Sequence, residues 1–250
     1  MNTGKFERPL KLLTECHRIA PGYLPCCVHL SIVHAHNKDF DKGLEILKFA
    51  LRLDPNYVHI NFHAGVYYKD YFGDFEMAKK HFMHVYNLTS GRFFQATLKM
   101  ADMELEDGKI DNAMKISGSV LNLDITNGEA WEIQGKGYML AGNLTNAEDI
   151  YVKLKAAQPN LPRYNLGLAN ILERKKDYAG AKEAYLVAVK GEPGAIQGWL
   201  GLYRIATYFN DETEKKIAQN KIDELKKTNT WLYTPSMFFI GEKPRQIKPE

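Results

Sequence analysis

Histidines gather near the start of this chain and are the first residues whose spacing suggests chemistry. All eight lie between His17 and His84, and His59 and His63 are four residues apart, as metal ligands on one helical face can be. His29, His34 and His36 lie about one repeat length before this pair. No carboxylate stands at a recognised offset such as that of H-E-x-x-H, and scattered histidines on helices are more often surface or packing residues. An adventitious nickel or zinc site is the alternative, but we expect no metal.

Residue patterns that mark enzymes are missing from the sequence. It has no Gly-rich phosphate loop and no G-x-S-x-G elbow. Cys16 and His17 are adjacent, so on a helix their side chains point about 100° apart and the cysteine gains no base. With Cys26 and Cys27, Cys16 forms neither an even disulfide framework nor a C-x-x-C motif, which agrees with a reducing compartment. We therefore expect no catalytic residue and no cofactor.

The composition indicates a folded protein with a large core. Its 250 residues are 45% apolar and 12% aromatic, which excludes disorder as the main state. A net charge of +3 is too small to indicate nucleic acid or an acidic membrane surface as the partner. No stretch approaches about 18 continuous apolar residues, and residues 1–10 hold no apolar signal-peptide core. These features predict a cytoplasmic protein that neither inserts into a membrane nor binds nucleic acid.

Residues 128–193 contain one pattern twice, 34 residues apart. The first copy is Trp131, Gly135, Tyr138, Gly142, Ala147, Tyr151, Leu154 and Pro159. The second copy is Asn165, Ala169, Leu172, Lys176, Ala181, Tyr185, Ala188 and Pro193, and three of the pairs are identical. The spacing predicts one helix before Gly142 and a second helix after it, which ends near the proline because proline cannot continue a helix.

Small residues in this pattern let two antiparallel helices approach closely. Gly135 and Ala147 supply the room, and Trp131 and Tyr151 fill the space beside them. A single helix pair cannot bury both of its faces, whereas stacked neighbours can. We therefore expect an elongated array of helix pairs.

The turn between the two helices, with the start of the second helix, recurs along nearly the whole chain. Its first residues are 34, 35, 35, 34 and 34 places apart, at Gly4, Lys38, Gly73, Gly108, Gly142 and Lys176. This spacing and the residue pattern resemble the tetratricopeptide repeat. The resemblance implies an all-α fold: a right-handed superhelical solenoid of antiparallel helix pairs, with about five full repeats, an N-terminal half repeat and a C-terminal tail.

The predicted boundaries follow this period. Residues 1–23 form a half repeat with only a second helix, over residues 7–20, which is either a lone capping helix or the start of a fragment from a longer array. The repeats lie near 24–57, 58–92, 94–127, 128–161, 162–195 and 196–227, and residues 228–250 form the tail. The last second helix is expected to drift by about three residues, to Ala218, Ile222 and Leu225, and to cap the array.

Some repeats match the pattern weakly. Cys27 stands where a large residue is typical in the first full repeat, and Thr97 and Ser117 do so in the third. The repeat between these two holds 11 of the chain's 29 aromatic residues, from Tyr57 to Phe94. We expect most of them in the core and the remainder in an interaction patch.

The tail is strongly apolar and then basic. Its apolar residues include Trp231, Leu232, Tyr233, Met237, Phe238, Phe239 and Ile240. A solvated linker would not be so aromatic, so we expect the tail to pack on the last repeats. The alternative is a linear motif that inserts into a groove, its own or that of a neighbouring chain.

In tetratricopeptide proteins the first helices of successive repeats line a concave groove that holds ligands, usually peptides. By that resemblance the partner-binding residues would be Phe62, Val66, Lys69, Leu98, Asp102, Lys136, Arg163, Leu166, Asn170, Arg174, Leu200 and Arg204, accompanied by Val28, Ile32, His36, His59, Glu129 and Glu132. The apolar members would anchor the segment, and Asn170 and the arginines would hold it by hydrogen bonds and charge. The alternative is that many of these side chains are only solvated parts of helix faces.

Family members that hold acidic chaperone tails carry a two-carboxylate clamp. Asn170 matches its asparagine position, but Leu166 stands where a lysine is needed and Gly201 where the next asparagine is needed. The resemblance therefore does not extend to chaperone-tail binding.

Together these observations predict a noncatalytic protein-interaction scaffold that binds a peptide or protein segment in its groove. Two alternatives stay open. One is a structural subunit that self-associates through its exposed ends and its tail. The other is the regulatory part of a larger multidomain protein.

Overall fold

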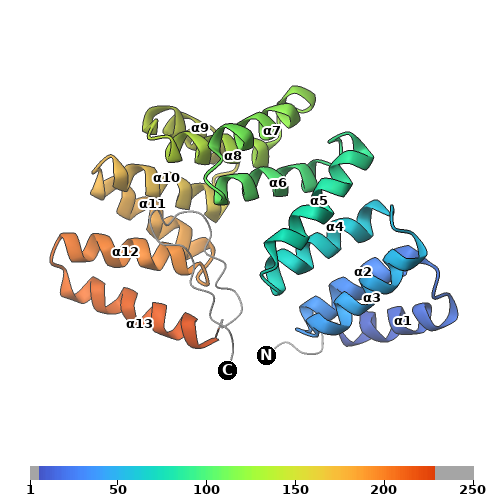
Figure 1. The fold of residues 1–250 in the computed structure, drawn as a ribbon. Coiled ribbons are helices and arrows are strands. Elements are labelled where there is room, and N and C mark those ends of the chain that lie inside the picture. Colours follow the sequence, from blue (N-terminus) through green and yellow to red (C-terminus); the bar gives the residue numbers. More distant parts are fainter. Residues whose placement is uncertain (1–5, 229–250) are drawn as a thin grey trace. The chain divides into compact units, whose positions relative to one another are not determined.

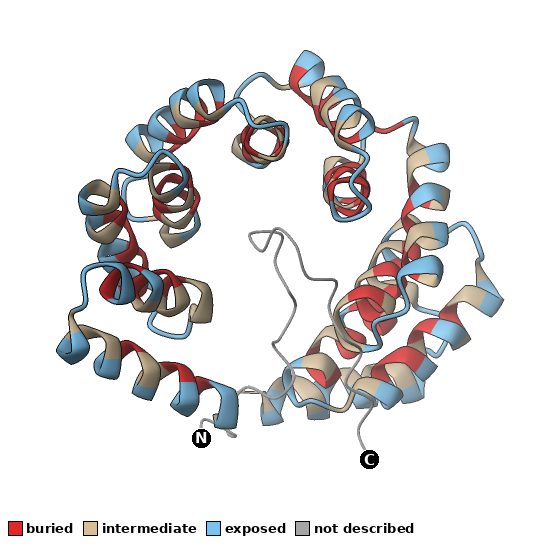
Figure 2. Ribbon diagram, turned by 60° about the vertical axis from the view of Figure 1, so that its left-hand side comes forward, coloured by how far each residue is buried: buried red, intermediate tan, exposed pale blue. Residues whose placement is uncertain are grey.

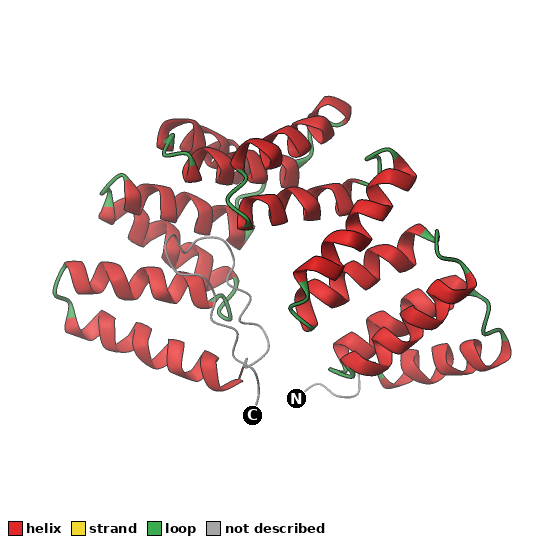
Figure 3. Ribbon diagram, in the orientation of Figure 1, coloured by secondary structure: helices red, strands yellow, loops and turns green. Residues whose placement is uncertain are grey.

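The structure, a computed structural model, describes residues 6–228 and consists of helices joined by short loops (Figure 1, Figure 3). Within that range there are thirteen α-helices, one π-helical turn and no strand. The predicted all-α array of antiparallel helix pairs is confirmed. The chain divides into two compact units, Met1–Met100 and Ala101–Glu250, here called unit 1 and unit 2.

Unit 1 contains a lone helix and two helix pairs. Its elements are α1 (Glu7–Ile19), α2 (Leu24–His36), α3 (Phe40–Leu53), α4 (Val58–Val66), the π turn η2 (Tyr67–Tyr71) and α5 (Phe75–Thr89). The next helix, α6 (Phe94–Glu106), crosses the boundary between the units. The lone helix α1 packs against α2 as the second helix of a repeat packs against the next first helix. None of the residues of α1 is buried.

Unit 2 continues the same alternation of first and second helices. Its elements are α7 (Ile110–Leu123), α8 (Gly128–Leu140), α9 (Leu144–Ala157), α10 (Pro162–Arg174), α11 (Tyr178–Gly191), α12 (Ile196–Tyr208) and α13 (Glu212–Thr228). Each even-numbered helix is the first of its pair, and it packs against the second helix of its own pair and of the pair before.

The repeat that begins with α4 is two residues longer than the others, because the first helices begin at residues 24, 58, 94, 128, 162 and 196. One extra residue is absorbed by η2, where the N–H of Phe72 donates to the carbonyl of Tyr67, one residue further back than in an α-helix. The other lies at the end of α5, which has 15 residues where α3 has 14. Ser90 and Gly91 follow with φ values of 51° and 75°. Both insertions therefore stay at helix ends, and the helices of the next repeat keep their register.

All six turns within the helix pairs pass through a residue in the left-handed region. These residues are Lys38, Gly73, Gly108, Gly142, Lys176 and Asn210, with φ between 56° and 81°. The first five are the predicted turn markers. Asn210 follows Lys176 by 34 residues and continues the series, because asparagine tolerates this conformation better than most residues.

Aromatic rings on the second helices fill gaps that glycines leave on the first helices. A Cβ atom added to Gly167 would lie 2.0 Å from the Tyr151 ring, and one added to Gly201 would lie 2.3 Å from the Tyr185 ring. Phe82 lies in the same way against Gly65. Buried residues accordingly gather where helices face one another (Figure 2).

The fourth residue of every first helix donates a hydrogen bond to the carbonyl six residues earlier. The donors are Cys27, Asn61, Thr97, Trp131, Asn165 and Trp199, and the acceptors are the carbonyls of Pro21, Pro55, Gly91, Ile125, Pro159 and Pro193. The donor–acceptor distances are 2.7–3.1 Å for nitrogen and oxygen donors and 3.8 Å for the thiol. Cys27 and Thr97 are thus regular members of the series, because the position requires a donor and not a large side chain.

The expected drift of the last second helix is wrong. Helix α13 begins at Glu212, 34 residues after the start of α11 at Tyr178. Ala218 and Ile222 are buried and lie 34 residues after Ala184 and Ala188, which are also buried. The inward positions occupied by Ala181 and Tyr185 in α11 hold the polar residues Lys215 and Gln219 here, and the register itself does not change.

Candidate protein-binding face

The candidate site is the surface presented by the first helices of unit 2, here called the first-helix face: α8, α10 and α12 with the end of α6. Ion pairs join each of these helices to the next. Lys136 of α8 lies 3.2 Å from Asp102 of α6, and Arg163 of α10 lies 3.1 Å from Glu132 of α8. Lys136 and Glu132 are themselves 3.6 Å apart, so four charges form one chain across three helices.

The middle of this chain of charges is largely buried, with 15% of the Lys136 side chain and 9% of the Glu132 side chain exposed. Burial acts to lower the pKa of Lys136, but the charges of Asp102 and Glu132 outweigh it, and the pKa is raised. Lys136 therefore stays charged. Removing one partner would leave a buried charge uncompensated, so the network fixes these side chains and the spacing of their helices.

A second network joins α10 and α12 around Tyr185 of α11. The Tyr185 hydroxyl lies 2.6 Å from the carboxylate of Glu173 and 2.9 Å from the amide oxygen of Asn170. Arg204 donates two hydrogen bonds to the Glu173 carboxylate, at 2.7 and 2.8 Å. Burial, and after it the charge of Glu173, raises the pKa of Tyr185, so the phenol is neutral. Asn170 and Arg204 are thus brought together, with Glu173 between them.

The other predicted residues of unit 2 also lie on this face. Arg163 and Arg204 are 49% and 41% exposed, and Arg174 is exposed and donates to the carbonyl of Met139 at 2.6 Å. Leu166 and Leu200 are half-buried. The face therefore combines guanidinium groups held in place with apolar side chains.

The predicted residues of unit 1 are mostly packed against neighbours. The Phe62 ring contacts those of Phe82 and Phe93, with centroids 5.9 and 5.2 Å away. Val66 is half-buried, and Lys69 lies in η2 and is buried.

Leu98 was expected to be an exposed anchor, and this expectation is wrong. Only 2% of the residue is exposed, because its side chain lies in the core beneath α6. Val28, one of the accompanying residues, is buried in the same way in α2.

Several histidines of unit 1 take part in packing, among them His17, His59 and His81. Among residues 6–228 no group of three or more His, Cys, Asp or Glu side chains could hold a metal ion. Burial, and after it the neighbouring His59 and His29, lowers the pKa of His63 to about 4. His59 lies edge-on to Phe93, with ring centroids 5.4 Å apart.

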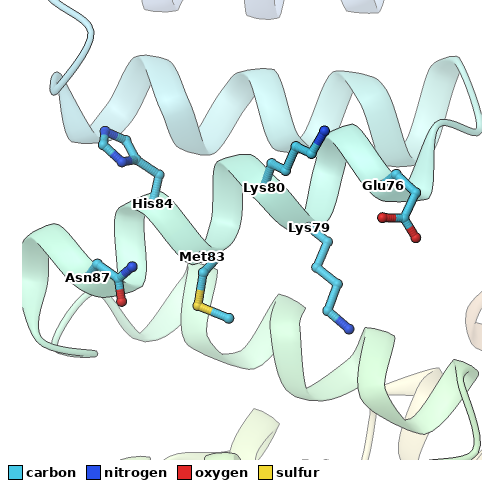
Figure 4. A pocket seen from close by; sticks show the side chains of 6 residues that line it. All are labelled: Glu76, Lys79, Lys80, Met83, His84 and Asn87. Atoms are coloured by element: carbon cyan, nitrogen blue, oxygen red, sulfur yellow. The ribbon is translucent and has the colours of Figure 1, made fainter.

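An open depression on the side of α5 in unit 1 offers little that would bind a ligand (Figure 4). Its side chains come from one helix: Glu76, Lys79, Lys80, Met83, His84 and Asn87. His84 is within 3.0 Å of Asn56 Oδ1, and in the close-up its ring and Lys80 point away from Met83. The mixed charges and the lack of a second wall leave the first-helix face as the stronger candidate.

Two features of the site could not be found from the repeat pattern. Glu173 and Tyr185 connect Asn170 to Arg204. The only sequence signal for this connection was the tyrosine that recurs 34 residues after Tyr151. The hydroxyl of Tyr151 is buried without a hydrogen-bond partner. The predicted docking of residues 229–250 lies outside the described residues and stays a prediction.

The helix pairs, their left-handed turns and their 34-residue period define an all-α helical-repeat protein. Comparison with solved structures places the fold among tetratricopeptide repeats. A tetratricopeptide repeat protein from Parabacteroides merdae matches with a TM-score of 0.77 at 13% identity, over 94% of each chain. Cut9, in the structure of the APC/C hetero-tetramer Cut9–Hcn1, matches with a TM-score of 0.77 at 10% identity, over 94% of this chain and 46% of Cut9. The chain therefore has the tetratricopeptide-repeat fold.

Sequence comparison adds one relative. Cilia- and flagella-associated protein 70 from Homo sapiens is 32% identical over 134 residues, which are 51% of this chain. The chain spans only 12% of the length of that protein. No family model matches the sequence. Among the described helices, none has the length and apolar character needed to cross a membrane.

Proposed function

We propose that this chain is a noncatalytic scaffold that binds a segment of another protein on the first-helix face of unit 2. The observation that carries the proposal is the fixation of Arg163 and Arg204 by Glu132 and Glu173 while each arginine stays nearly half exposed. Side chains that are ordered before binding lose little conformational entropy when a partner docks. The fixed guanidinium groups would hold carbonyl or carboxylate oxygens of the segment.

Apolar contact would come from Leu166 and Leu200, which are half-buried beside these arginines. A few anchors of this kind usually supply most of the binding free energy. The likeness to Cut9 supports a protein partner, since that repeat protein forms a hetero-tetramer with Hcn1.

The proposal is tested by selecting peptides from a displayed random library against the intact chain and measuring their affinity by calorimetry. We expect Leu200→Gln to weaken binding about tenfold, as for a typical interface anchor. Leu186→Gln is the matched control, because Leu186 is 47% exposed on α11, a second helix of the same unit. Peptides that lose affinity on Leu186→Gln, and not on Leu200→Gln, would place binding on the other face and refute the proposal.

Self-association is the competing function. The observation that favours it is the exposure of large apolar side chains on α1. Leu12 and Ile19 are 61% and 68% exposed on this helix. Light scattering coupled to size exclusion, over a range of concentrations, compares the intact chain with a version that ends at Lys227. Monomers in both cases support the scaffold. Oligomers formed only by the intact chain support assembly through the tail.

We also propose a ciliary or flagellar setting for the scaffold. The support is the 32% identity over 134 residues to a protein named for its association with cilia and flagella. The test is to express the tagged chain in ciliated cells and image it. Signal along the cilium or at its base agrees with the proposal, and signal spread through the cell body contradicts it.

A further inference from the structure

Tyr151 of α9 carries a hydroxyl that the fold does not use. The residue is 0% exposed, and its hydroxyl oxygen has no hydrogen-bond partner. Leaving a buried hydroxyl unpaired costs stability, so each such group in a native structure requires an explanation.

Packing does not provide that explanation. Phe82, Tyr151 and Tyr185 are each the eighth residue of their second helix, and each ring lies against a glycine of a first helix. Phe82 fills this place in α5 without a hydroxyl and is fully buried. Tyr185 uses its hydroxyl to hold Glu173 and Asn170. At Tyr151 a phenylalanine would fill the same space without an unpaired group.

The hydroxyl of Tyr151 points away from its own helix toward the first-helix face. The ring passes between α8 and α10, since added Cβ atoms on Gly135 and Gly167 would lie 2.8 and 2.0 Å from it. Burial first, and then Glu132 and Asp102, raises the pKa of the phenol, while Arg163 acts to lower it. These groups belong to α6, α8 and α10, and the phenol of Tyr151 is a neutral donor.

The surrounding charges indicate which acceptor fits. Asp102 and Glu132 are balanced by Lys136 and Arg163, so a neutral group can enter without disturbing the network, whereas an added carboxylate would face two others. Elsewhere in the fold Tyr67 donates to the main-chain carbonyl of Ser31, and Tyr185 contacts both the Asn170 amide oxygen and the Glu173 carboxylate.

We propose that the hydroxyl of Tyr151 donates a hydrogen bond to a main-chain carbonyl of the bound segment, at the point where that segment crosses between α8 and α10. The inference rests on the proposed function and specifies one contact of it. Arg163, which is 49% exposed, links α10 to α8 through its 3.1 Å contact with Glu132 and also lies 3.4 Å from the Tyr164 hydroxyl. Since every peptide has main-chain carbonyls, this contact would position a segment whatever its sequence.

The test uses the intact chain with ¹³C-labelled tyrosine rings and the blocked peptide acetyl-tetraalanine methylamide as a neutral probe. The signal of Tyr151 is identified by its loss in Tyr151→Phe. We expect the peptide to shift this signal saturably and sodium acetate at equal ionic strength to leave it unchanged. A shift caused by acetate alone, or no shift with the peptide, overturns the inference.

Two variants separate this contact from a structural role. We expect Tyr151→Phe to keep or raise the unfolding midpoint and to weaken library-selected peptides roughly 5- to 10-fold, as for one lost hydrogen bond. Tyr185→Phe is the matched variant and should lower the midpoint, because it removes the contacts of a hydroxyl in the same position with Asn170 and Glu173. A lowered midpoint in Tyr151→Phe would show that the hydroxyl is satisfied within the fold and would refute the inference. Peptides weakened by Leu200→Gln but not by Tyr151→Phe would refute it while leaving the proposed function standing.

Discussion

The fourth residue of each first helix shows how one hydrogen bond organises the entry into a repeat. The carbonyl that accepts this hydrogen bond lies six residues earlier, in the loop after the preceding helix. The hydrogen bond ties the first helix to the loop before it, so the position favours a donor of any size. Tryptophan, asparagine, threonine and cysteine are chemically unlike, yet each can donate this bond.

A substitution that keeps an aromatic side chain but removes the donor tests this explanation. Trp131→Phe deletes the indole N–H that donates to the carbonyl of Ile125 at 2.8 Å. We expect the free energy of unfolding, measured with denaturant, to fall by about 1 kcal/mol. Tyr208→Phe is the control, because it removes a polar group from an exposed ring and should change stability little. Equal effects of the two substitutions would mean that the hydrogen bond of Trp131 contributes little to stability.

A partly buried histidine of unit 1, His63, makes stability depend on pH. Burial, His59 and His29 lower the pKa of His63 to about 4 from the ordinary value of 6.5. Between these values the unfolded chain binds a proton that the folded chain does not, so the free energy of unfolding falls as the pH drops from about 6.5 to 4. We expect a loss of about 1–3 kcal/mol over this window, followed by denaturant unfolding at each pH.

His63→Gln should flatten this pH dependence. His81, whose pKa is also lowered by burial and by His84, will leave a smaller residual slope of the same sign. An unchanged slope in the variant would show that other groups, such as paired carboxylates, cause the acid sensitivity.

The sequence could predict which residues share the first-helix face but not which of them are already occupied. Helical spacing alone places Asn170 and Arg204 on that face, since it depends only on backbone geometry. Their connection through Glu173 depends on side-chain rotamers in three helices, and a 34-residue period contains no information about rotamers. Leu98 fails for the same reason: periodicity orients a residue, but the packing of the neighbouring helices determines its exposure.

At the scale of helices, adjacent elements are matched by pairs of a large ring and a glycine. Tyr151 fits against Gly167 and Tyr185 against Gly201, each ring contacting the first helix of the following repeat. Where α7 carries the small Ser117, no ring is available, and Gln134 of α8 donates to its hydroxyl at 2.9 Å. The weak match of Ser117 to the repeat pattern is therefore compensated by its neighbour.

Two glycines inside helices should respond to alanine in opposite ways. Gly167→Ala places a methyl group 2.0 Å from the Tyr151 ring and should cost about 1–3 kcal/mol, as overpacking does. Gly118→Ala in α7 meets only Gln134, at 3.8 Å, and should stabilise by about 0.5–1 kcal/mol through helix propensity. Chemical denaturation of both variants gives the comparison. A loss of stability in both would indicate that the α7–α8 contact is tighter than the structure shows.

The elements were largely predictable, because the period fixes where helices start and turn. All six first helices begin at the first residues of the predicted repeats. The π turn and the register of α13 were not predictable. The π turn is a rearrangement of backbone hydrogen bonds around one added residue. The register of α13 does not show in the repeat pattern, because Lys215 and Gln219 replace Ala181 and Tyr185 of the preceding second helix.

At the scale of the whole array, each helix pair depends on its neighbours for burial. Stability in such proteins is close to a sum of repeat and interface contributions, so it decreases where a neighbour is missing. None of the residues of α1 is buried, whereas α3 buries Leu44, Leu47 and Ala50.

Hydrogen exchange should reveal this difference within unit 1. We expect the amides of α1 to exchange much faster than those of α3, because local opening of α1 exposes little buried apolar surface. Mass spectrometry of the intact chain, with peptides covering residues 7–19 and 40–53, measures both rates at once. Equal protection of the two helices would mean that α1 has a further packing partner, such as a second molecule.

The two insertions in the α4–α5 repeat have a consequence for how such a chain can change over generations. A codon added within an α-helix rotates every later side chain by about 100°, which would disrupt all the packing that follows. A codon added where η2 or the Ser90–Gly91 turn lies is confined to a few residues, and the next repeat is unaffected. The ends of helices are thus the places where the gene can gain or lose length without loss of the fold.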